Sequence, residues 1–188
     1  MFIRSERLFL RPGWPEDWPE LLLRISDEQV VRNLAKAPWP YTPDDARWFA
    51  RQPQDPRCPH FFVTLPSRTG GAELVGCVGL ARDGDEVELG YWFAREHWGQ
   101  GYATEAGRAV LRLARTLRHR KIVSKHFADN PASGRVLAKL GFCATGELRP
   151  SYNLARGCTV PALVHTLEFA AQSDCGGDDD GLPGMRAA

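Results

Sequence analysis

The fold of this chain is decided by the stretch Glu88-Leu89-Gly90-Tyr91-Trp92-Phe93 and, after a short gap, by Trp98-Gly99-Gln100-Gly101-Tyr102-Ala103-Thr104. The pattern predicts a β-strand, a short glycine-rich turn and the start of a long helix. Two glycines and an alanine leave little side-chain bulk in the turn, so its backbone N–H groups can approach a ligand closely. The helix adds the unsatisfied donors of its first turn and the positive end of its dipole. The turn is therefore a candidate anion site, and phosphate is the usual ligand of such sites.

Two well-known phosphate-binding loops do not fit this turn. A P-loop ends in Gly-Lys-Ser/Thr, and no Lys follows Gly101. A dinucleotide fingerprint needs a third small residue three positions after its second Gly, within a βαβ unit. Thr104 occupies that third position, and the sequence shows no such unit. A different kind of phosphate loop has to be considered.

Length and composition indicate a single domain. The chain has 188 residues, of which 43% are hydrophobic and 25% charged, which is ordinary for a globular protein with a sizeable core. Residues 173–188 are rich in Asp and Gly and carry four Asp against one Arg, a net charge of −3. Because the whole chain has a formal charge of +1, residues 1–172 carry +4. We predict one domain over residues 1–172 and a disordered acidic, glycine-rich tail over residues 173–188.

The same features restrict the partners of the protein. A net charge of +4 is too small to indicate nucleic acid, but it suits an anionic cofactor. The N-terminus lacks a signal pattern, and no apolar run approaches membrane-spanning length, so we expect a cytoplasmic protein without membrane attachment. Five widely spaced cysteines support neither a disulfide framework nor a zinc site, and we expect no metal. Of these, Cys77 and Cys143 lie in apolar strands and are interpreted as core residues.

Periodicity and turn residues predict the remaining elements. Helices are expected over residues 18–25 and about 28–34, and a third follows the Thr42 cap and Pro43. A strand at 7–11 comes first, and an antiparallel meander is predicted over 60–65, 74–81 and 87–93. Helix 104–117 then leads to a strand at 121–127, parallel to 87–93 if the helix is a crossover. A capped helix from Asn130 to about Leu140 and two strands, about 143–152 and 163–170, complete a mixed sheet.

Three motifs resemble the GCN5-related N-acetyltransferase (GNAT) family, and in particular its branch related to the ribosomal-protein N-terminal acetyltransferases. The first is the loop Trp98-Gly99-Gln100-Gly101-Tyr102-Ala103, similar to the family's acyl-CoA pyrophosphate loop Arg/Gln-x-x-Gly-x-Gly/Ala. Trp98 stands where Arg or Gln leads that motif, which puts one side-chain contact of the loop in doubt. The others are Asn130-Pro131-Ala132-Ser133 followed by Lys139-Leu140-Gly141-Phe142, and the opening Glu6-Arg7-Leu8-Phe9-Leu10-Arg11-Pro12.

This resemblance implies an α/β (α+β) fold of three layers. The expected mixed, mostly antiparallel sheet has six to seven strands, splays open at the acyl-CoA site and is flanked by about four helices. The resemblance also implies acetyl transfer from acetyl-CoA to a primary amine, either a protein N-terminus or a small amine, by direct attack on the thioester. A catalytically silent acyl-CoA-binding or regulatory module of the same fold is the alternative. The protein is expected as a monomer or homodimer.

In the family, the cofactor lies between the two parallel strands. By resemblance, backbone groups of Trp92, Phe93 and Ala94 pair with pantetheine. The pyrophosphate is assigned to the loop, and the side-chain amide of Asn130, also a helix cap, is assigned to the pantetheine arm. The loop residues concerned are Gly99, Gln100, Gly101, Tyr102, Ala103 and Thr104.

Two residues are candidates for proton transfer. Strand alternation places Glu88 on one face with Gly90 and Trp92, where it can act as the base for the amine. The alternative for Glu88 is a structural carboxylate paired with a nearby Arg. Ser133 is the candidate for returning a proton to the CoA sulfur, by resemblance to the branch, against an ordinary first-turn serine. Trp39 and Tyr41 are candidates for acceptor contacts, because the family's second helical region overhangs the acceptor site.

Overall fold

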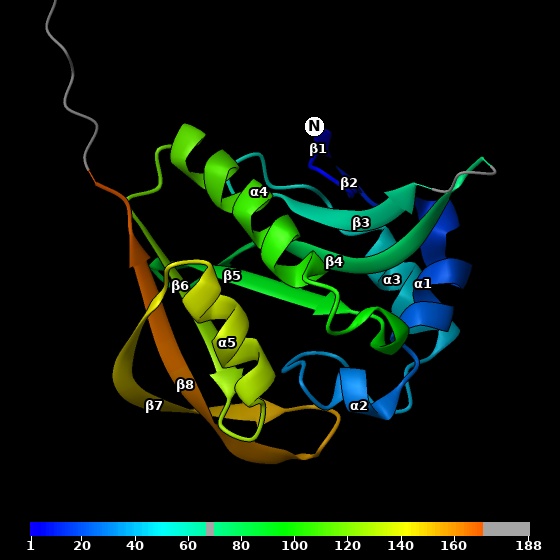
Figure 1. Ribbon diagram of the computed structural model, residues 1–188. Coiled ribbons are helices and arrows are strands. Elements are labelled where there is room, and N and C mark those ends of the chain that lie inside the picture. The colour runs from blue at the N-terminus through cyan, green and yellow to red at the C-terminus, as the bar shows by residue number, and fades with distance from the viewer. Residues whose placement is uncertain (67–69, 171–188) are drawn as a thin grey trace, which may run out of the picture.

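The computed structural model describes residues 1–66 and 70–170, and the predicted tail 173–188 lies outside them. Within these residues, eight strands form one sheet in the order β1-β2-β3-β4-β5-β6-β8-β7 (Figure 1). Among these eight described strands, β5 and β6 are the one parallel pair, as the crossover helix predicts. The sheet is therefore mixed and mostly antiparallel as expected, with one strand more than the upper estimate.

The N-terminal part supplies an edge of the sheet and one helical layer. The expected first strand is β2, and a two-residue strand before it, β1, is too short to give a pattern. The predicted cap at Thr42 is confirmed at the start of the third helix, where Thr42 and Asp45 also form a reciprocal capping box. The bounds are β1 Ile3–Arg4, β2 Phe9–Arg11, the 3-10 helix η1 Pro15–Asp17, α1 Trp18–Ile25, α2 Glu28–Val31 and α3 Pro43–Ala50.

The predicted meander is present as β3 His60–Pro66, β4 Ala72–Asp83 and β5 Glu86–Phe93. Helix α4, Tyr102–Thr116, then crosses over to β6, Lys121–Phe127. β5 and β6 share a single register pair, Glu88 with Val123, and their remaining lengths diverge, as the two arrows in Figure 1 show. The Ser124 hydroxyl donates to the Leu89 carbonyl at 2.8 Å, just where the strands part. The expected splaying of the sheet is confirmed.

The C-terminal part covers the opened region. α5, Pro131–Lys139, is capped by Asn130, whose side chain accepts from the Ser133 amide, and Gly141 follows it at a φ of +90°. The last two strands are β7 Cys143–Asn153 and β8 Cys158–Glu168. β8 begins earlier than predicted, because Pro150 and Pro161 face each other within the ladder instead of interrupting it.

Two hydrophobic cores lie on opposite faces of the sheet, which confirms the three-layer fold. α4 and α5 pack on one face around residues such as Leu89 and Leu137, each of which contributes about 1.5–3 kcal/mol by burial. α1, α2 and α3 pack on the other face around Phe62, Cys77 and Trp92 (Figure 1). Cys77 is buried as predicted. The expectation for Cys143 was wrong, because Cys143 begins β7, an edge strand whose first residues are all exposed.

Candidate active site

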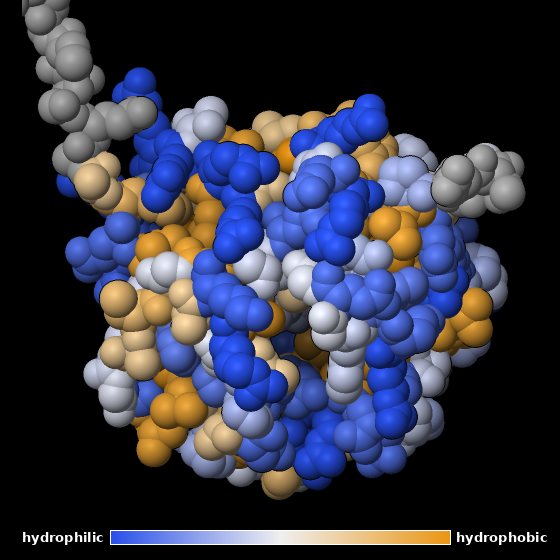
Figure 2. All heavy atoms as spheres, viewed as in Figure 1, coloured by the Kyte–Doolittle hydropathy of each residue, from blue (hydrophilic) through white to orange (hydrophobic). Residues whose placement is uncertain are grey.

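A cavity of about 1660 Å³ opens where β5 and β6 diverge, and Figure 2 shows the surface hollowed there. Its wall on one side is made by the glycine-rich loop and α5, and on the other by α2, α3 and the segment between them. The cavity therefore passes through the gap in the sheet and reaches both helical layers. A donor held on one face and an acceptor on the other can meet in this gap.

The glycine-rich loop follows the 3-10 helix η2, Arg95–His97, and leads directly into α4. Gly99 and Gly101 have φ angles of +76° and +82°, a region that other residues adopt only with strain. Gly101 is the N-cap of α4 and has no side chain to occupy the first-turn donors. Of the residues assigned to the cofactor, Gly99, Gly101, Tyr102, Ala103 and Thr104 line the cavity, whereas Gln100 and Ala94 do not.

Trp98, the residue that departs from the family's loop motif, carries no charge, and its side chain hydrogen-bonds to the protein's own backbone. Its indole Nε1 donates to the Phe93 carbonyl at 2.8 Å and ties the loop to the end of β5. The Ala94 amide donates to the Val75 carbonyl at 2.9 Å, so that amide is occupied within the protein. Gly90 lies open, since a Cβ added there meets nothing within 4 Å. Close approach to β5 is therefore easiest between Glu88 and Trp92.

Strand alternation predicts that Glu88 shares a face with Trp92, and in the structure this face carries the α1–α3 layer. Its carboxylate contacts Lys125 Nζ at 3.0 Å, and the same ammonium also pairs with Asp83. Burial raises the pKa of Glu88 above the ordinary value, and the opposing effect of Lys125 is smaller. The carboxyl group is thus partly buried and paired with a lysine, where the sequence suggested an arginine as the alternative.

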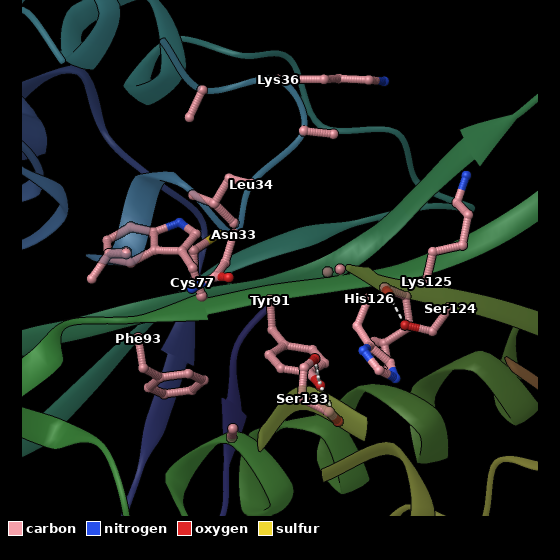
Figure 3. Close-up of a pocket in the computed structure, with 18 of the residues that line it drawn as sticks. Asn33, Leu34, Lys36, Cys77, Tyr91, Phe93, Ser124, Lys125, His126 and Ser133 are labelled. Carbon is pink, nitrogen blue, oxygen red and sulfur yellow. Dashed lines mark hydrogen bonds between the residues drawn. The ribbon is translucent and has the colours of Figure 1, made fainter. Parts of the chain in front are cut away.

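Ser133 lies on the opposite face, in the first turn of α5. Its Oγ is 2.7 Å from the hydroxyl of Tyr91, and Figure 3 shows the two side chains pointing toward each other. Burial raises the pKa of Tyr91 to about 12, so the phenol keeps its proton at neutral pH. The Asn130 side-chain oxygen accepts from the Ser133 amide at 3.3 Å, which is its helix-capping role. Asn130 and Ser133 both line the cavity.

The structure separates the two aromatic candidates for acceptor contacts. Tyr41 is 9% exposed and lines the cavity on the side of Glu88. Burial together with the nearby Asp45 raises the pKa of Tyr41, which therefore stays neutral. Trp39 is 40% exposed and is not part of the cavity wall. The short helix α2 ends before the segment that carries both, and only Tyr41 turns inward.

Sequence reasoning missed Lys125, Tyr91 and Lys36, which all line the cavity (Figure 3). Lys125 lies on β6 and reaches Glu88 only because the two strands are neighbours. Alternation placed Tyr91 on the strand face opposite Glu88 but indicated no partner for its hydroxyl. Lys36 has no periodic signal, but its positive charge opposes the rise that burial causes in the pKa of Glu88 and adds to the lowering of the Asp83 pKa that Lys125 causes. No sequence signal could have found Lys36. Lys125 could have been noticed, because it is a charged residue inside the predicted strand 121–127.

Other candidate chemistries are not supported by the described part of the chain. Among residues 1–66 and 70–170, no group of three His, Cys, Asp or Glu side chains could hold a metal ion. Within the same residues, no helix has the length and apolar character needed to cross a membrane.

An eight-stranded mixed sheet that opens between β5 and β6, with a glycine-rich helix start at the opening, is the architecture of the acetyltransferases that the motifs indicate. The chain matches the family described as "Acetyltransferase (GNAT) domain" over residues 7–143, and it belongs to this family.

The chain is 38% identical over 174 residues to the uncharacterized N-acetyltransferase YoaA of Bacillus subtilis (strain 168), covering 88% of this chain and 95% of YoaA. It is 33% identical over 81 residues to the ribosomal-protein-serine acetyltransferase of Escherichia coli (strain K12), covering 41% of this chain and 45% of that protein. The similarity to a member of the ribosomal-protein branch thus extends over part of the chain. The crystal structure of a GNAT-family acetyltransferase from Bacillus anthracis superimposes with a TM-score of 0.76 at 24% identity, covering 89% of this chain and 98% of that one.

Proposed function

We propose that this protein is an N-acetyltransferase that moves an acetyl group from acetyl-CoA to a primary amine by direct attack on the thioester. One observation carries the proposal. The gap between β5 and β6 joins a glycine-rich anion site on the α4–α5 side to a partly buried carboxylate, Glu88, on the α1–α3 side. Such an arrangement suits a reaction in which a phosphate-bearing donor and an amine enter from opposite faces.

The cofactor would occupy the α4–α5 side of the cavity. The pyrophosphate is assigned to the first turn of α4 and to the loop residues Gly99 and Gly101, which carry no side chain of their own and line the cavity. The pantetheine arm would extend along the free edge of β5 and pair with its backbone like an added strand. Asn130, which lines the cavity, would supply the side-chain amide for the arm. These assignments put the thioester in the gap, next to Gly90 and Ser124.

The acceptor would enter on the α1–α3 side. Because alkylamines are mostly protonated at neutral pH, the acceptor must lose a proton before it attacks. Glu88 is the group in the cavity placed to take that proton, directly or through water. The amine nitrogen then bonds to the thioester carbon, and a backbone N–H near Trp92 or Phe93 would stabilise the oxyanion. Tyr41 and Trp92 would contact the remainder of the acceptor.

Collapse of the intermediate breaks the carbon–sulfur bond and leaves a thiolate that needs a proton. Ser133 is proposed as the donor, and its hydroxyl is held in place by Tyr91 at 2.7 Å. The phenol of Tyr91 can in turn donate to Ser133 Oγ as the serine proton leaves. The nitrogen of the protonated amine loses two protons in all, one to Glu88 before attack and one as the intermediate collapses. One proton restores what the Ser133–Tyr91 pair gave to the sulfur and the other leaves to solvent, so the products are an N-acetyl amide, free CoA and one proton.

One observation favours a catalytically silent CoA-binding module instead. The Glu88 carboxylate is already paired with Lys125, so it could serve only to hold β5 and β6 together. Turnover separates the two functions. A panel of amines, from amino acids and polyamines to short peptides with free N-termini, is offered with acetyl-CoA, and release of free thiol is followed. The acetyltransferase predicts amine-dependent release. If acetyl-CoA raises the melting temperature but no amine releases thiol, the protein is a silent module.

A further inference from the structure

The loop proposed to bind pyrophosphate contains no cation of its own. Residues 98–105 include neither Lys nor Arg, and Trp98 occupies the place where the family's motif has Arg or Gln. The same segment carries one acid, Glu105, in the first turn of α4. A carboxylate there competes with a bound phosphate for the positive end of the helix dipole. A group outside the loop must therefore offset this negative charge.

Arg7 supplies that charge from the other end of the chain. It lies in the turn between β1 and β2, and its guanidinium Nε donates to Glu105 Oε2 at 2.8 Å. Nη1 donates to the Gln100 carbonyl at 3.0 Å, and the guanidinium carbon lies 4.7 Å from the centre of the Tyr102 ring. One side chain thus contacts Gln100, Tyr102 and Glu105 of the loop region.

The Glu105 carboxylate is fully engaged by the N-terminal segment. Besides the Arg7 side chain, the Arg7 amide and the Ser5 hydroxyl each donate to Oε1 at 2.7 Å. Burial alone would raise the pKa of Glu105, but these hydrogen bonds and the Arg7 charge lower it overall. Glu105 therefore remains an anion that is neutralised by Arg7 at 12% side-chain exposure.

The third guanidinium nitrogen of Arg7, Nη2, lies near Gly101. Arg7 Nη2 lies 3.5 Å from the position that a Cβ of Gly101 would take. Arg7 itself is not part of the cavity wall, so it contacts the loop from outside the cavity. Its hydrogen bond to the Gln100 carbonyl restrains the peptide group between Gln100 and Gly101.

We propose that Arg7 is the positioning residue of the cofactor loop and replaces the cation that the loop lacks at Trp98. Its planar guanidinium bridges the Gln100 carbonyl and the Glu105 carboxylate, which holds the loop in its anion-binding form and cancels the charge of Glu105. The inference rests on the proposed function, because it assumes that the phosphates of CoA bind at this loop. The proposal makes the turn between β1 and β2 part of the cofactor site.

Calorimetric titration of Arg7→Met with CoA tests the proposal, since Met keeps an unbranched apolar side chain but removes the charge and the donors. The dissociation constant for CoA should rise roughly tenfold, the effect of losing one charge-assisted hydrogen bond. Binding of pantetheine, which has no phosphate, is followed by ligand-detected NMR at millimolar concentration and should not change. Arg4→Ala removes an exposed arginine of β1 and is the matched control, with CoA affinity as in the parent protein.

The outcomes separate the possibilities. Equal loss of CoA and pantetheine binding would mean a general structural role for Arg7, and unchanged CoA binding in folded Arg7→Met would overturn the inference outright. Should Arg7→Met not fold, Arg7→Lys carries the same test. It keeps a charge but cannot bridge both acceptors, and the CoA dissociation constant should still rise by severalfold. A parent protein that binds no CoA would contradict the proposed function itself.

Discussion

Glu88, Lys125 and Asp83 form one chain of contacts across β4, β5 and β6, with the lysine ammonium between two carboxylates. Burial and the Asp83 charge make Glu88 a better base than an exposed glutamate, and Lys125 acts in the opposite direction. The group can therefore be a functional base and a structural ion pair at the same time. Kinetics of single variants can separate the two roles.

Glu88→Gln keeps the size of the side chain and removes its basicity. Transfer to an amine found in the thiol-release screen should fall by roughly a hundredfold, the lower end for loss of a general base. CoA affinity should stay near that of the parent, since Glu88 lies on the opposite face from the loop. Raising the pH should restore part of the rate, because more of the amine is already deprotonated. Parent-like turnover at neutral pH would make Glu88 structural.

Lys125→Met should move the pH dependence of the reaction. Glu88 works as a base only when ionised, so kcat/KM rises as the pH passes through its pKa. Lys125 lowers that pKa, and its removal should raise it further, which shifts the acidic limb of the profile to higher pH. Lys121→Met, at the exposed start of the same strand, is the control and should leave the limb in place. A limb that does not move in Lys125→Met would show that a group other than Glu88 titrates.

At the scale of elements, β5 is the strand that both substrates would use. One side of it carries Leu89 and Tyr91 into the α4–α5 layer, and the other carries Glu88 and Trp92 into the α1–α3 layer. Gly90 lies between the last two and faces open space, so bulk can be added there without a clash. This position offers a direct test of where the acceptor lies.

Gly90→Val should fill the acceptor side of the gap while leaving the strand intact. Val suits a strand, and no atom lies within 4 Å of its future Cβ, so the free energy of unfolding should change by no more than about 0.5 kcal/mol. The transfer rate should fall roughly tenfold or more, because small displacements of the reacting atoms are costly. Gly90→Ala should give an intermediate rate. If both variants acetylate every tested amine like the parent, the acceptor enters elsewhere.

At the scale of the whole molecule, the turn between β7 and β8 closes the acceptor side. The fully buried Asn153 donates to the carbonyls of Arg32 and Leu34 at 3.0 and 3.2 Å. The Leu154 amide donates to the Ala35 carbonyl at 3.0 Å, and Arg156 pairs with Asp129. A segment near the C-terminus is thereby fixed to the end of α2, and the cavity wall is completed by residues more than a hundred positions apart.

Asn153→Ala should loosen the attachment of this turn to α2 and lower the stability of the protein. Two carbonyls lose a buried donor, and the Arg156 amide loses its acceptor on Asn153 Oδ1. The free energy of unfolding, measured with urea, should fall by about 1–3 kcal/mol. Asn33→Ala removes a single exposed bond to the Gln29 carbonyl and should stay within about 0.5 kcal/mol of the parent. Equal effects of the two substitutions would contradict the closing role of Asn153.

Much of this architecture is determined locally and could be predicted from the sequence. The Thr42–Asp45 capping box, the Asn130 cap and Gly141 specify helix ends through residues only a few positions apart. Alternation in 88–93 was enough to assign Glu88 and Tyr91 to opposite faces, and the two glycines predicted the loop. The exposure of Cys143 was harder to predict, since it depends on the position of β7 at the edge of the sheet.

The sequence by itself determined the family, the order of elements and the position of the loop, because helix caps, periodicity and turn residues act over a few neighbouring positions. Only the tertiary structure decided which side chains meet. Lys125 reaches Glu88, Tyr91 reaches Ser133 and Arg7 reaches Glu105, across separations of 37, 42 and 98 residues along the chain. These contacts depend on strand neighbours and on packing across layers, and such long-range pairings leave no periodic trace in the sequence.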